Sequence, residues 1–317
     1  MFNWIENLFA SLHDTVFESC VLPLVHALGW GGYAEQAFDA TEFFLIGVIE
    51  VSLLALIMIP LEKWRPVETQ TNTPDRRIDL IYTLLHRLGL LPLLMFAALL
   101  PLVDGLDGWL RLHDFIPPKL EDIFPSLNQR PLLSLLIYMA VLDFAGYWLH
   151  RAQHTFGWWW ALHSLHHSQQ QMHFWSDDRN HLLDSLILDA IFALLALVIG
   201  VPPGQFAASV VIMRCLQSLA HANLRMSFGR IGERLLVSPR FHRIHHAIGL
   251  GHEGVHQGCN FAVLLPVWDV LFGTARFDPV YPGTGIRDQL VGRHYGQGFW
   301  SQQWLGLKRL ARHFTHS

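Results

Sequence analysis

The sequence predicts an all-α integral membrane protein with about four to five transmembrane helices and a helical cap outside the lipid. Charged residues make up only 15% of the 317 residues, against roughly 25% in ordinary soluble domains. Mean hydropathy is positive, at +0.28. Several apolar stretches are close to the length of about 20 residues that a membrane-spanning helix needs. The histidines, by contrast, gather in polar segments between and after these stretches.

The first 130 residues are expected to form one amphipathic segment and two membrane spans. Residues 1–40 contain no Lys or Arg, which argues against a signal peptide, and their apolar residues recur at helical spacing. Within residues 41–130, the apolar stretches 43–60 and 78–103 are long enough to cross a bilayer. Glu50 lies in the middle of the first stretch. It should face protein or water, because a carboxylate that faces lipid is costly.

Further apolar stretches predict two or three spans in the second half. Residues 131–149 form the third predicted span and residues 183–202 the fourth. Residues 205–222 form either a fifth span or a re-entrant partner of the fourth. These boundaries divide the chain into an amphipathic segment, N-terminal membrane helices with their loops, a histidine-rich region and a C-terminal tail: 1–40, 41–130, 131–287 and 288–317.

The positive charges predict how the spans are oriented. The first 62 residues carry no Lys or Arg, whereas the loop after the first span contains Lys63, Arg65, Arg76 and Arg77. Loops rich in Lys and Arg stay on the cytoplasmic side of a membrane, so the first span should end there. Counting the spans forward places the histidine-rich segments on the same side. We therefore expect a bacterial inner-membrane protein whose histidine site faces the cytoplasm.

The net charge and the cysteines exclude other classes of protein. The net charge of −4 leaves no basic surface for nucleic acid. The three cysteines, Cys20, Cys215 and Cys259, are far apart in the sequence. They predict neither a disulfide framework nor a thiolate metal site.

Eight of the twenty histidines form three clusters with helical spacing, in the patterns HxxxH, HxxHH and HxxHH. They are His150, His154, His163, His166, His167, His242, His245 and His246. Residues three or four apart share one face of a helix, so each cluster can direct two or three imidazoles at one point. Neutral imidazole binds zinc, iron and copper. Three such clusters hold more ligands than one ion can take, which predicts a site for two metal ions.

Three residues outside the clusters are further candidates. His221 ends the last apolar stretch, and we expect it to be another ligand. His181 is expected either as a ligand or as a partner that orients one. Asp143 lies seven residues before His150, about two turns along the same helix face. There it could accept a hydrogen bond from the second nitrogen of a metal-bound imidazole.

The ligand types favour two iron ions. Zinc sites usually close with three or four ligands, often including a carboxylate or a thiolate, whereas this site has eight or more imidazoles and no clustered carboxylate. A site at the lipid boundary would meet an apolar substrate. Oxidation of an unactivated C–H bond requires a metal and O2, because no side chain supplies that chemistry. Two other functions stay open, namely a dizinc membrane hydrolase and a non-catalytic metal-binding membrane protein.

The histidine patterns, preceded by Tyr-Trp at 147–148, resemble those of the fatty acid hydroxylase superfamily, also called the sterol desaturase family. Residues 238–246 resemble the last histidine box of that family. Residues 260–261 and 268–274 resemble its C-terminal signature. The resemblance extends over about 132–287, whereas the N-terminal part is recognised by hydropathy alone.

This resemblance implies membrane helices with a cytosolic cap, a histidine-ligated di-iron centre between them, and O2 as co-substrate. The eight clustered histidines match the ligands of the family, and His221 matches a further ligand. Some members have another histidine four residues earlier, where this chain has Gln217; His181 or Asn223 could take that place. Zinc could replace iron in purified protein. No cytochrome b5-like domain is fused, so we expect a separate ferredoxin- or cytochrome b5-like electron donor.

The expected reaction is hydroxylation of a C–H bond in a membrane lipid, a fatty acyl chain or a sterol-like substrate. Desaturation begins with the same hydrogen abstraction, and the resemblance also allows ether cleavage. No residue in the sequence distinguishes these outcomes.

Overall fold

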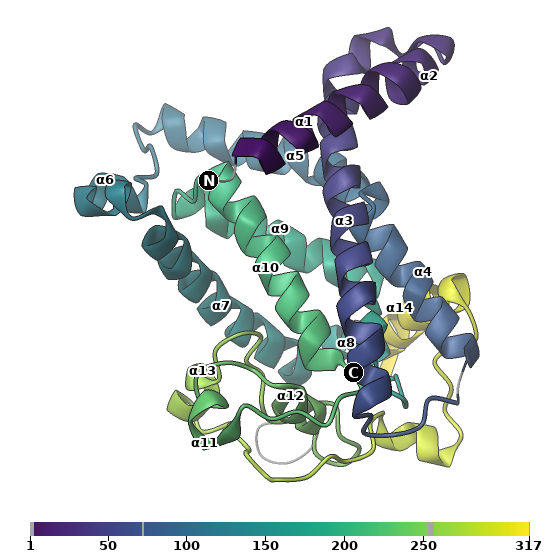
Figure 1. Cartoon of the computed structure of the whole chain (residues 1–317). Helices are drawn as coiled ribbons and strands as arrows, with labels where there is room; N and C mark the ends of the chain where they lie inside the picture. Colours follow the sequence, from purple (N-terminus) through teal and green to yellow (C-terminus); the bar gives the residue numbers. More distant parts are fainter. Residues whose placement is uncertain (1–2, 72, 253–256, 317) are drawn as a thin grey trace.

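The computed structural model describes residues 3–71, 73–252 and 257–316, which form helices joined by loops (Figure 1). Helices account for 71% of the structure. Within these ranges there is no strand, and the one isolated β-bridge pairs Ala247 with Thr284. The prediction of an all-α protein is therefore confirmed.

The molecule contains five long helices; four of them run toward one end, where several shorter helices gather into a cap, and the second of the five lies across the opposite end (Figure 1). They are α3 (Ala34–Trp64), α5 (Leu90–Leu112), α7 (Pro131–Thr155), α9 (Leu182–Val198) and α10 (Pro203–His221). Helices α9 and α10 form an antiparallel hairpin. At about 1.5 Å per residue, their lengths of about 26 and 28 Å approach the thickness of a bilayer core, which is about 30 Å.

The N-terminal region is more helical and more apolar than expected. It consists of α1 (Asn3–Val16), the π-helical turn η1 (Phe17–Val21), α2 (Leu22–Ala27) and the 3₁₀ turn η2 (Gly31–Tyr33). Among the described residues, three stretches are long and apolar enough to cross a membrane: Trp4–Ala27, Gly31–Trp64 and Pro131–Thr155. The chain is a membrane protein, and its N-terminal segment is long enough to cross the bilayer as well as to lie on it.

The prediction of a single second span over residues 78–103 is wrong. Helix α4 (Thr73–Arg87) ends two residues before Gly89, and α5 begins directly after it. Gly89 has a φ of 85°, a left-handed conformation that glycine adopts without steric cost. Helix α5 also continues to Leu112, beyond the predicted end of that span at residue 103, and is followed by the short helices α6 (Leu120–Ile123) and η3 (Pro125–Gln129).

Helices α3 and α4 approach closely at Gly47. A Cβ atom on this glycine would lie 1.8 Å from the carbonyl oxygen of Arg87, so no larger residue fits without a shift of the backbone. One turn further along α3, Glu50 is buried and forms an ion pair with Arg87, with 2.7 Å between Oε1 and Nη1. The prediction that Glu50 faces protein and not lipid is confirmed.

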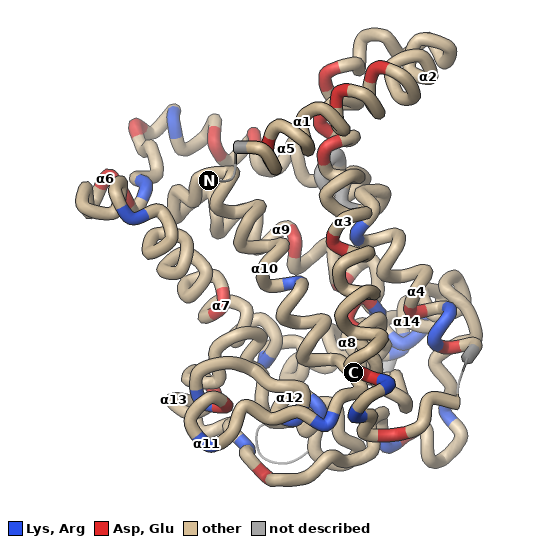
Figure 2. The backbone as a smooth tube through the Cα atoms, viewed as in Figure 1, with Lys and Arg blue, Asp and Glu red and all other residues tan. Residues whose placement is uncertain are grey.

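The cap is built from short helices around the ends of the long ones. Besides α4 it contains α8 (Gly157–His167), η4 (Phe174–Asp178), α11 (Gly229–Gly232), α12 (Pro239–His245), α13 (Val267–Leu271), η5 (Arg287–Val291) and α14 (Phe299–His316). Figure 2 shows many of the charged residues in this cap, whereas α7, α9 and α10 carry only isolated charges between their ends.

The expected C-terminal tail contains a packed helix. In α14, Gln303 donates a hydrogen bond to the hydroxyl of Tyr82 at 2.9 Å, and Arg309 donates to the carbonyl of Ala161 at 3.0 Å. These contacts fix α14 against α4 and α8. The C-terminal segment therefore supports the helix that carries the second histidine cluster.

Candidate metal centre

The structure brings eight of the nine predicted histidine ligands together in two buried groups of four. Histidine group one contains His150 and His154 of α7, His167 of α8 and His245 of α12. Histidine group two contains His166 of α8, His221 of α10, His242 of α12 and His246, which follows α12. In each group, one ring nitrogen from every member lies within 4.8 Å of those from the other three.

The ring nitrogens in each group lie at the spacing of ligands to one ion. In group two, the Nε2 atoms of His166 and His221, of His221 and His242, and of His242 and His246 are each 3.1 Å apart. In group one, the Nε2 atoms of His154 and His167 are also 3.1 Å apart. Two nitrogens that each bind a metal at about 2.0–2.1 Å lie roughly 2.9–3.4 Å from each other.

Hydrogen bonds alone do not account for group two. A neutral imidazole nitrogen carries either one N–H donor or one lone pair. Four Nε2 atoms can therefore form at most two ordinary hydrogen bonds, yet three contacts of 3.1 Å connect them. A cation that accepts all four lone pairs satisfies every atom. The arrangement of the donors thus fits a bound metal ion.

The second ring nitrogens are held by main-chain carbonyls in three of the histidines. Nδ1 of His150 donates to the carbonyl of Phe261, Nδ1 of His221 to that of Gln217, and Nδ1 of His245 to that of Cys259, each at 2.8 Å. A proton fixed on Nδ1 leaves the lone pair on Nε2 free for a metal. These backbone contacts orient ligands in both groups.

His163 lies between the two groups without belonging to either. Its ring centroid is 5.2 Å from that of His150 and 5.3 Å from that of His166. Nδ1 lies 3.1 Å from a carboxylate oxygen of Asp184, whose other oxygen accepts hydrogen bonds from Gln153 and Trp159. Nε2 of His163 is buried and has no hydrogen-bond partner among the described residues.

Burial keeps the cap histidines neutral. It lowers the pKa of five imidazoles well below the ordinary value, and the neighbouring imidazoles lower it further. The five are His166, His167, His242, His245 and His246. Because only the neutral ring binds a metal, these side chains are ready to act as ligands near neutral pH.

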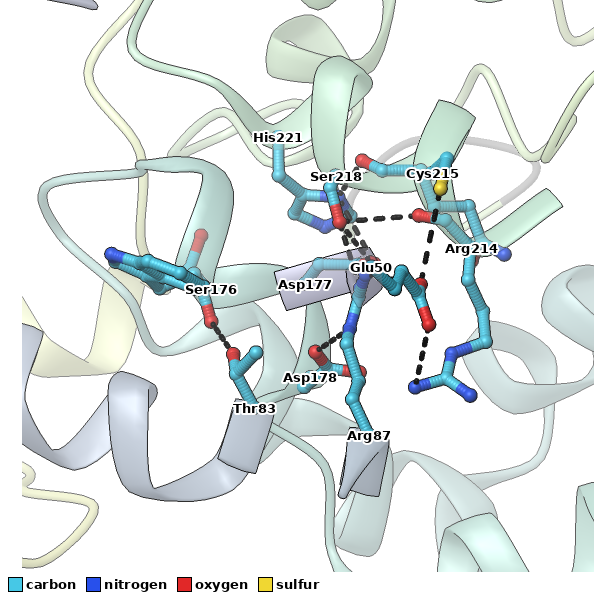
Figure 3. Close-up of polar contacts among 12 residues, drawn as sticks. Glu50, Thr83, Arg87, Ser176, Asp177, Asp178, Arg214, Cys215, Ser218 and His221 are labelled. Carbon is cyan, nitrogen blue, oxygen red and sulfur yellow. Dashed lines mark hydrogen bonds and ion pairs between the residues drawn. The ribbon is translucent and has the colours of Figure 1, made fainter. Parts of the chain in front are cut away.

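A buried network of charges supports group two (Figure 3). Arg87 donates to Asp177 at 2.9 Å, to Asp178 at 2.7 Å and to the hydroxyl of Ser218 at 2.7 Å, in addition to its pair with Glu50. Asp177 lies 3.4 Å from Nδ1 of His221. The network therefore links α3, α4, η4 and α10 beside an imidazole of group two.

Two further candidates lie outside the groups, because their polar atoms are engaged elsewhere. His181 caps α9, with Nδ1 accepting from the amide of Leu183 at 3.1 Å, and its Nε2 lies 2.9 Å from the carbonyl of Gln303. Asn223 binds the main chain at residues 67–68 with both atoms of its amide group. Neither residue lies in either histidine group of this structure.

Asp143 and Gln217 also differ from expectation. Asp143 accepts hydrogen bonds from the amides of Leu264 and Leu265 and from the indole of Trp268, at 2.8–2.9 Å. These contacts anchor the C-terminal loop to α7, and the hydrogen bonds of Asp143 go to main-chain amides and an indole and not to an imidazole. Gln217 orients His221 through its main-chain carbonyl, and it lines the cavity described next.

A cavity of about 480 Å³ connects the histidines to the membrane helices. Five of the nine predicted histidine ligands line it, namely His150, His163, His166, His221 and His242, together with His86. Its walls come from α5, α7, α9 and α10 and are mainly apolar, with Leu142, Leu188, Phe192 and Met213 among the lining residues. A pocket of this size and character is typical of sites for small organic ligands.

Sequence reasoning missed the acidic residues that orient the histidines. Asp184 and Asp177 contact His163 and His221, respectively. A signal for Asp184 was present, because it is one of two ionisable residues, with Asp189, in a mainly apolar stretch. Asp177 lies in a polar loop, where an acidic residue carries no such signal.

Comparisons with known proteins agree with this geometry. The fatty acid hydroxylase family matches residues 135–274, a region that contains both histidine groups. An ornithine lipid hydroxylase from Rhizobium tropici is 26% identical over 84% of this chain and 78% of its own length. Alkylglycerol monooxygenases from zebrafish (Danio rerio) and Homo sapiens are each 31% identical over 42% of this chain. The matched part spans only 28% of those two enzymes.

No solved structure gave a significant match. The family match includes all eight histidines of the two groups. Residues 135–274, which contain both histidine groups, are therefore similar to the fatty acid hydroxylase family.

Proposed function

We propose that this protein is an O2-dependent di-iron oxygenase that hydroxylates a C–H bond of a membrane lipid. The observation that carries the proposal is the cavity, which begins at the histidines and continues between apolar membrane helices. A lipid could enter it from the bilayer without crossing water. The names of the relatives, a lipid hydroxylase and two monooxygenases, support the same reaction class.

The nine histidines would hold two irons, one in each group, with His163 beside both. Bound iron supplies the reduction of O2 to an oxidant able to attack an unactivated C–H bond. In the overall reaction one oxygen atom enters the lipid and the other leaves as water, with two electrons and two protons supplied from outside. A separate ferredoxin- or cytochrome b5-like protein would provide the electrons.

The residues of the chain position the reactants and exclude water. All nine histidines are buried, so an oxidant formed at the site would be kept from solvent. Asp184 holds the ring of His163, and the carbonyls of Phe261, Gln217 and Cys259 fix three further rings. The apolar cavity wall would place the lipid chain so that one carbon lies near the histidines.

The positive charges support one orientation of the site. The C-terminal end of α3 and the loop after it carry Lys63 and Arg65, and the amide of Arg225 from the cap binds the carbonyl of Arg65 at 2.8 Å. The basic loop and the cap therefore lie together. By the positive-inside rule, we propose that both face the cytoplasm of a bacterial inner membrane.

Lipid extracts from cells with and without the protein would test the function. Growth under isotope-labelled O2 should give a lipid heavier by one labelled oxygen atom, only where the protein is present. The variants His166→Ala and His245→Ala should lose this product, whereas His313→Ala, on the exposed face of α14, should keep it. Ester hydrolysis by a zinc-loaded protein without O2 uptake would show the rival hydrolase instead. Loss of two hydrogens would show desaturation.

A further inference from the structure

The cavity contains a carboxylate that the metal centre does not use. Asp189 lies in the apolar helix α9 and lines the cavity. Its side chain has no hydrogen bond or ion pair among the described residues, and Arg214 is the charged group near enough to act on it. An ionisable residue inside the membrane part of a protein is costly and usually marks a functional site.

Helical spacing places Asp189 in the middle of the cavity wall. The residues of α9 that line the cavity are Ser185, Leu188, Asp189, Phe192 and Ala193, which form one face of the helix. On α10 the lining face includes Met213, Arg214, Gln217 and His221. Asp189 and Arg214 thus lie at a similar height on neighbouring walls.

Asp189 and Arg214 lie apart from the histidines along the cavity. Asp189 is five residues beyond Asp184, which contacts His163, and Arg214 is seven residues before His221. At 1.5 Å per residue, the two charged residues lie about 8–10 Å from the imidazoles along the helix axes. A substrate could therefore contact the imidazoles and these two charged residues at the same time.

The positive charge of Arg214 is already countered from the other side. One of its Nη atoms lies 3.7 Å from Glu50, which is also paired with Arg87 (Figure 3). Arg87 in turn contacts Asp177 and Asp178. Arg214 is therefore already engaged with Glu50, and Asp189 is left without an ion pair among the described residues. A cation in the cavity could pair with it.

We propose that Asp189 binds the protonated amine of the substrate, so that the enzyme acts on an amine-bearing lipid. This inference rests on the proposed lipid hydroxylation and names its substrate class. The ammonium group would contact the carboxylate of Asp189, while the rest of the lipid would lie against the apolar wall of the cavity. The oxidised carbon then lies within about 8–10 Å of the amine. The name of the Rhizobium tropici relative, an ornithine lipid hydroxylase, is consistent with such a substrate.

Binding without turnover would test the proposal. The probes are N-palmitoyl-ornithine and the same molecule with its side-chain amine acetylated, which removes the positive charge. The metal-loaded protein in phosphatidylcholine nanodiscs is titrated with each probe without O2 or electron donor, and binding is followed by native mass spectrometry. The wild type should bind the free amine about tenfold more tightly, since a close charge pair across a binding interface contributes at least that much.

Matched variants separate the charge from the shape of the side chain. Asp189→Asn is nearly isosteric and should bind both probes within about threefold of each other, whereas Asp189→Glu should keep a preference for the amine. Asp278→Asn removes an exposed cap carboxylate that pairs with Arg276, and it should behave as the wild type. The metal content of Asp189→Asn should be unchanged.

Three results would overturn the inference: equal binding of the two probes by the wild type, a preference for the amine that survives in Asp189→Asn, or loss of metal from that variant. The last result would mean that the carboxylate balances the charge of the metal centre. Oxidation of lipids without any amine preference would leave the proposed function standing without this inference. Amine binding through Asp189 without any lipid oxidation would support this inference and contradict the proposed function.

Discussion

Replacing Arg87 with Met should strongly destabilise the protein. The guanidinium is buried and lies 2.7 Å from Glu50, 2.9 Å from Asp177 and 2.7 Å from Asp178. Methionine fills similar space but leaves these three carboxylates without their shared counter-charge. Breaking one buried ion pair in this way costs about 3–5 kcal/mol. With three partners affected, we expect a loss of about 5 kcal/mol.

The melting temperature in detergent, followed by the loss of the folded peak in size-exclusion chromatography, measures this effect. For chains of 150–250 residues, 1 kcal/mol corresponds to roughly 2–4 °C, so Arg87→Met should melt on the order of 10 °C lower. The control Arg65→Met removes an exposed guanidinium that lies over the ring of Trp64, and it should change stability by less than about 0.5 kcal/mol.

A double variant tests the cause of the loss. Adding Glu50→Gln to Arg87→Met removes one of the uncompensated carboxylates. It should recover part of the stability, with an interaction energy of about 0.5–3 kcal/mol. If Arg87→Met melts within 2 °C or so of Arg65→Met, or if Glu50→Gln lowers stability further in the Arg87→Met background, the network does not stabilise the fold as argued here.

Three other substitutions test separate contacts. Asp184→Asn should weaken metal binding about 10- to 100-fold in a metal titration, because it removes the carboxylate that orients His163; unchanged affinity would mean that this contact is only structural. His181→Ala should lower the stability by about 1 kcal/mol through the lost cap of α9 but leave the metal content intact, and metal loss would restore it as a ligand. Gly47→Ala should prevent stable folding, because its Cβ would lie 1.8 Å from a carbonyl oxygen of α4; normal expression and melting would contradict the close approach of α3 and α4.

The sequence was enough to predict that the histidines converge. Each cluster lies on a helix, or ends one, and the 3.6-residue period fixes which ring nitrogens share a face. The division into two groups could not be read in the same way. His166 and His167 are neighbours in one cluster but belong to different groups, because adjacent helical residues point about 100° apart. Which helices then meet each face depends on the packing of α7, α8, α10 and α12.

The contacts that orient the ligands were the least predictable part. Three imidazoles are held by main-chain carbonyls, including those of Phe261 and Cys259, and no residue type encodes a carbonyl. The break between α4 and α5 was also missed, because hydropathy shows one continuous apolar stretch. The conformation of Gly89, with φ of 85°, divides it. A glycine two residues after Arg87 was the one local signal of that break.

The central claim is that the two histidine groups each hold one iron, and the metal content of the purified protein tests it most directly. Protein from iron-supplied cells, analysed by mass spectrometry for metals and by Mössbauer spectroscopy, should contain two irons per chain. His245→Ala in group one and His242→Ala in group two should each lose at least one iron, while His313→Ala keeps both. A single iron per chain in the wild type, or two zinc ions that iron does not replace, would contradict the account.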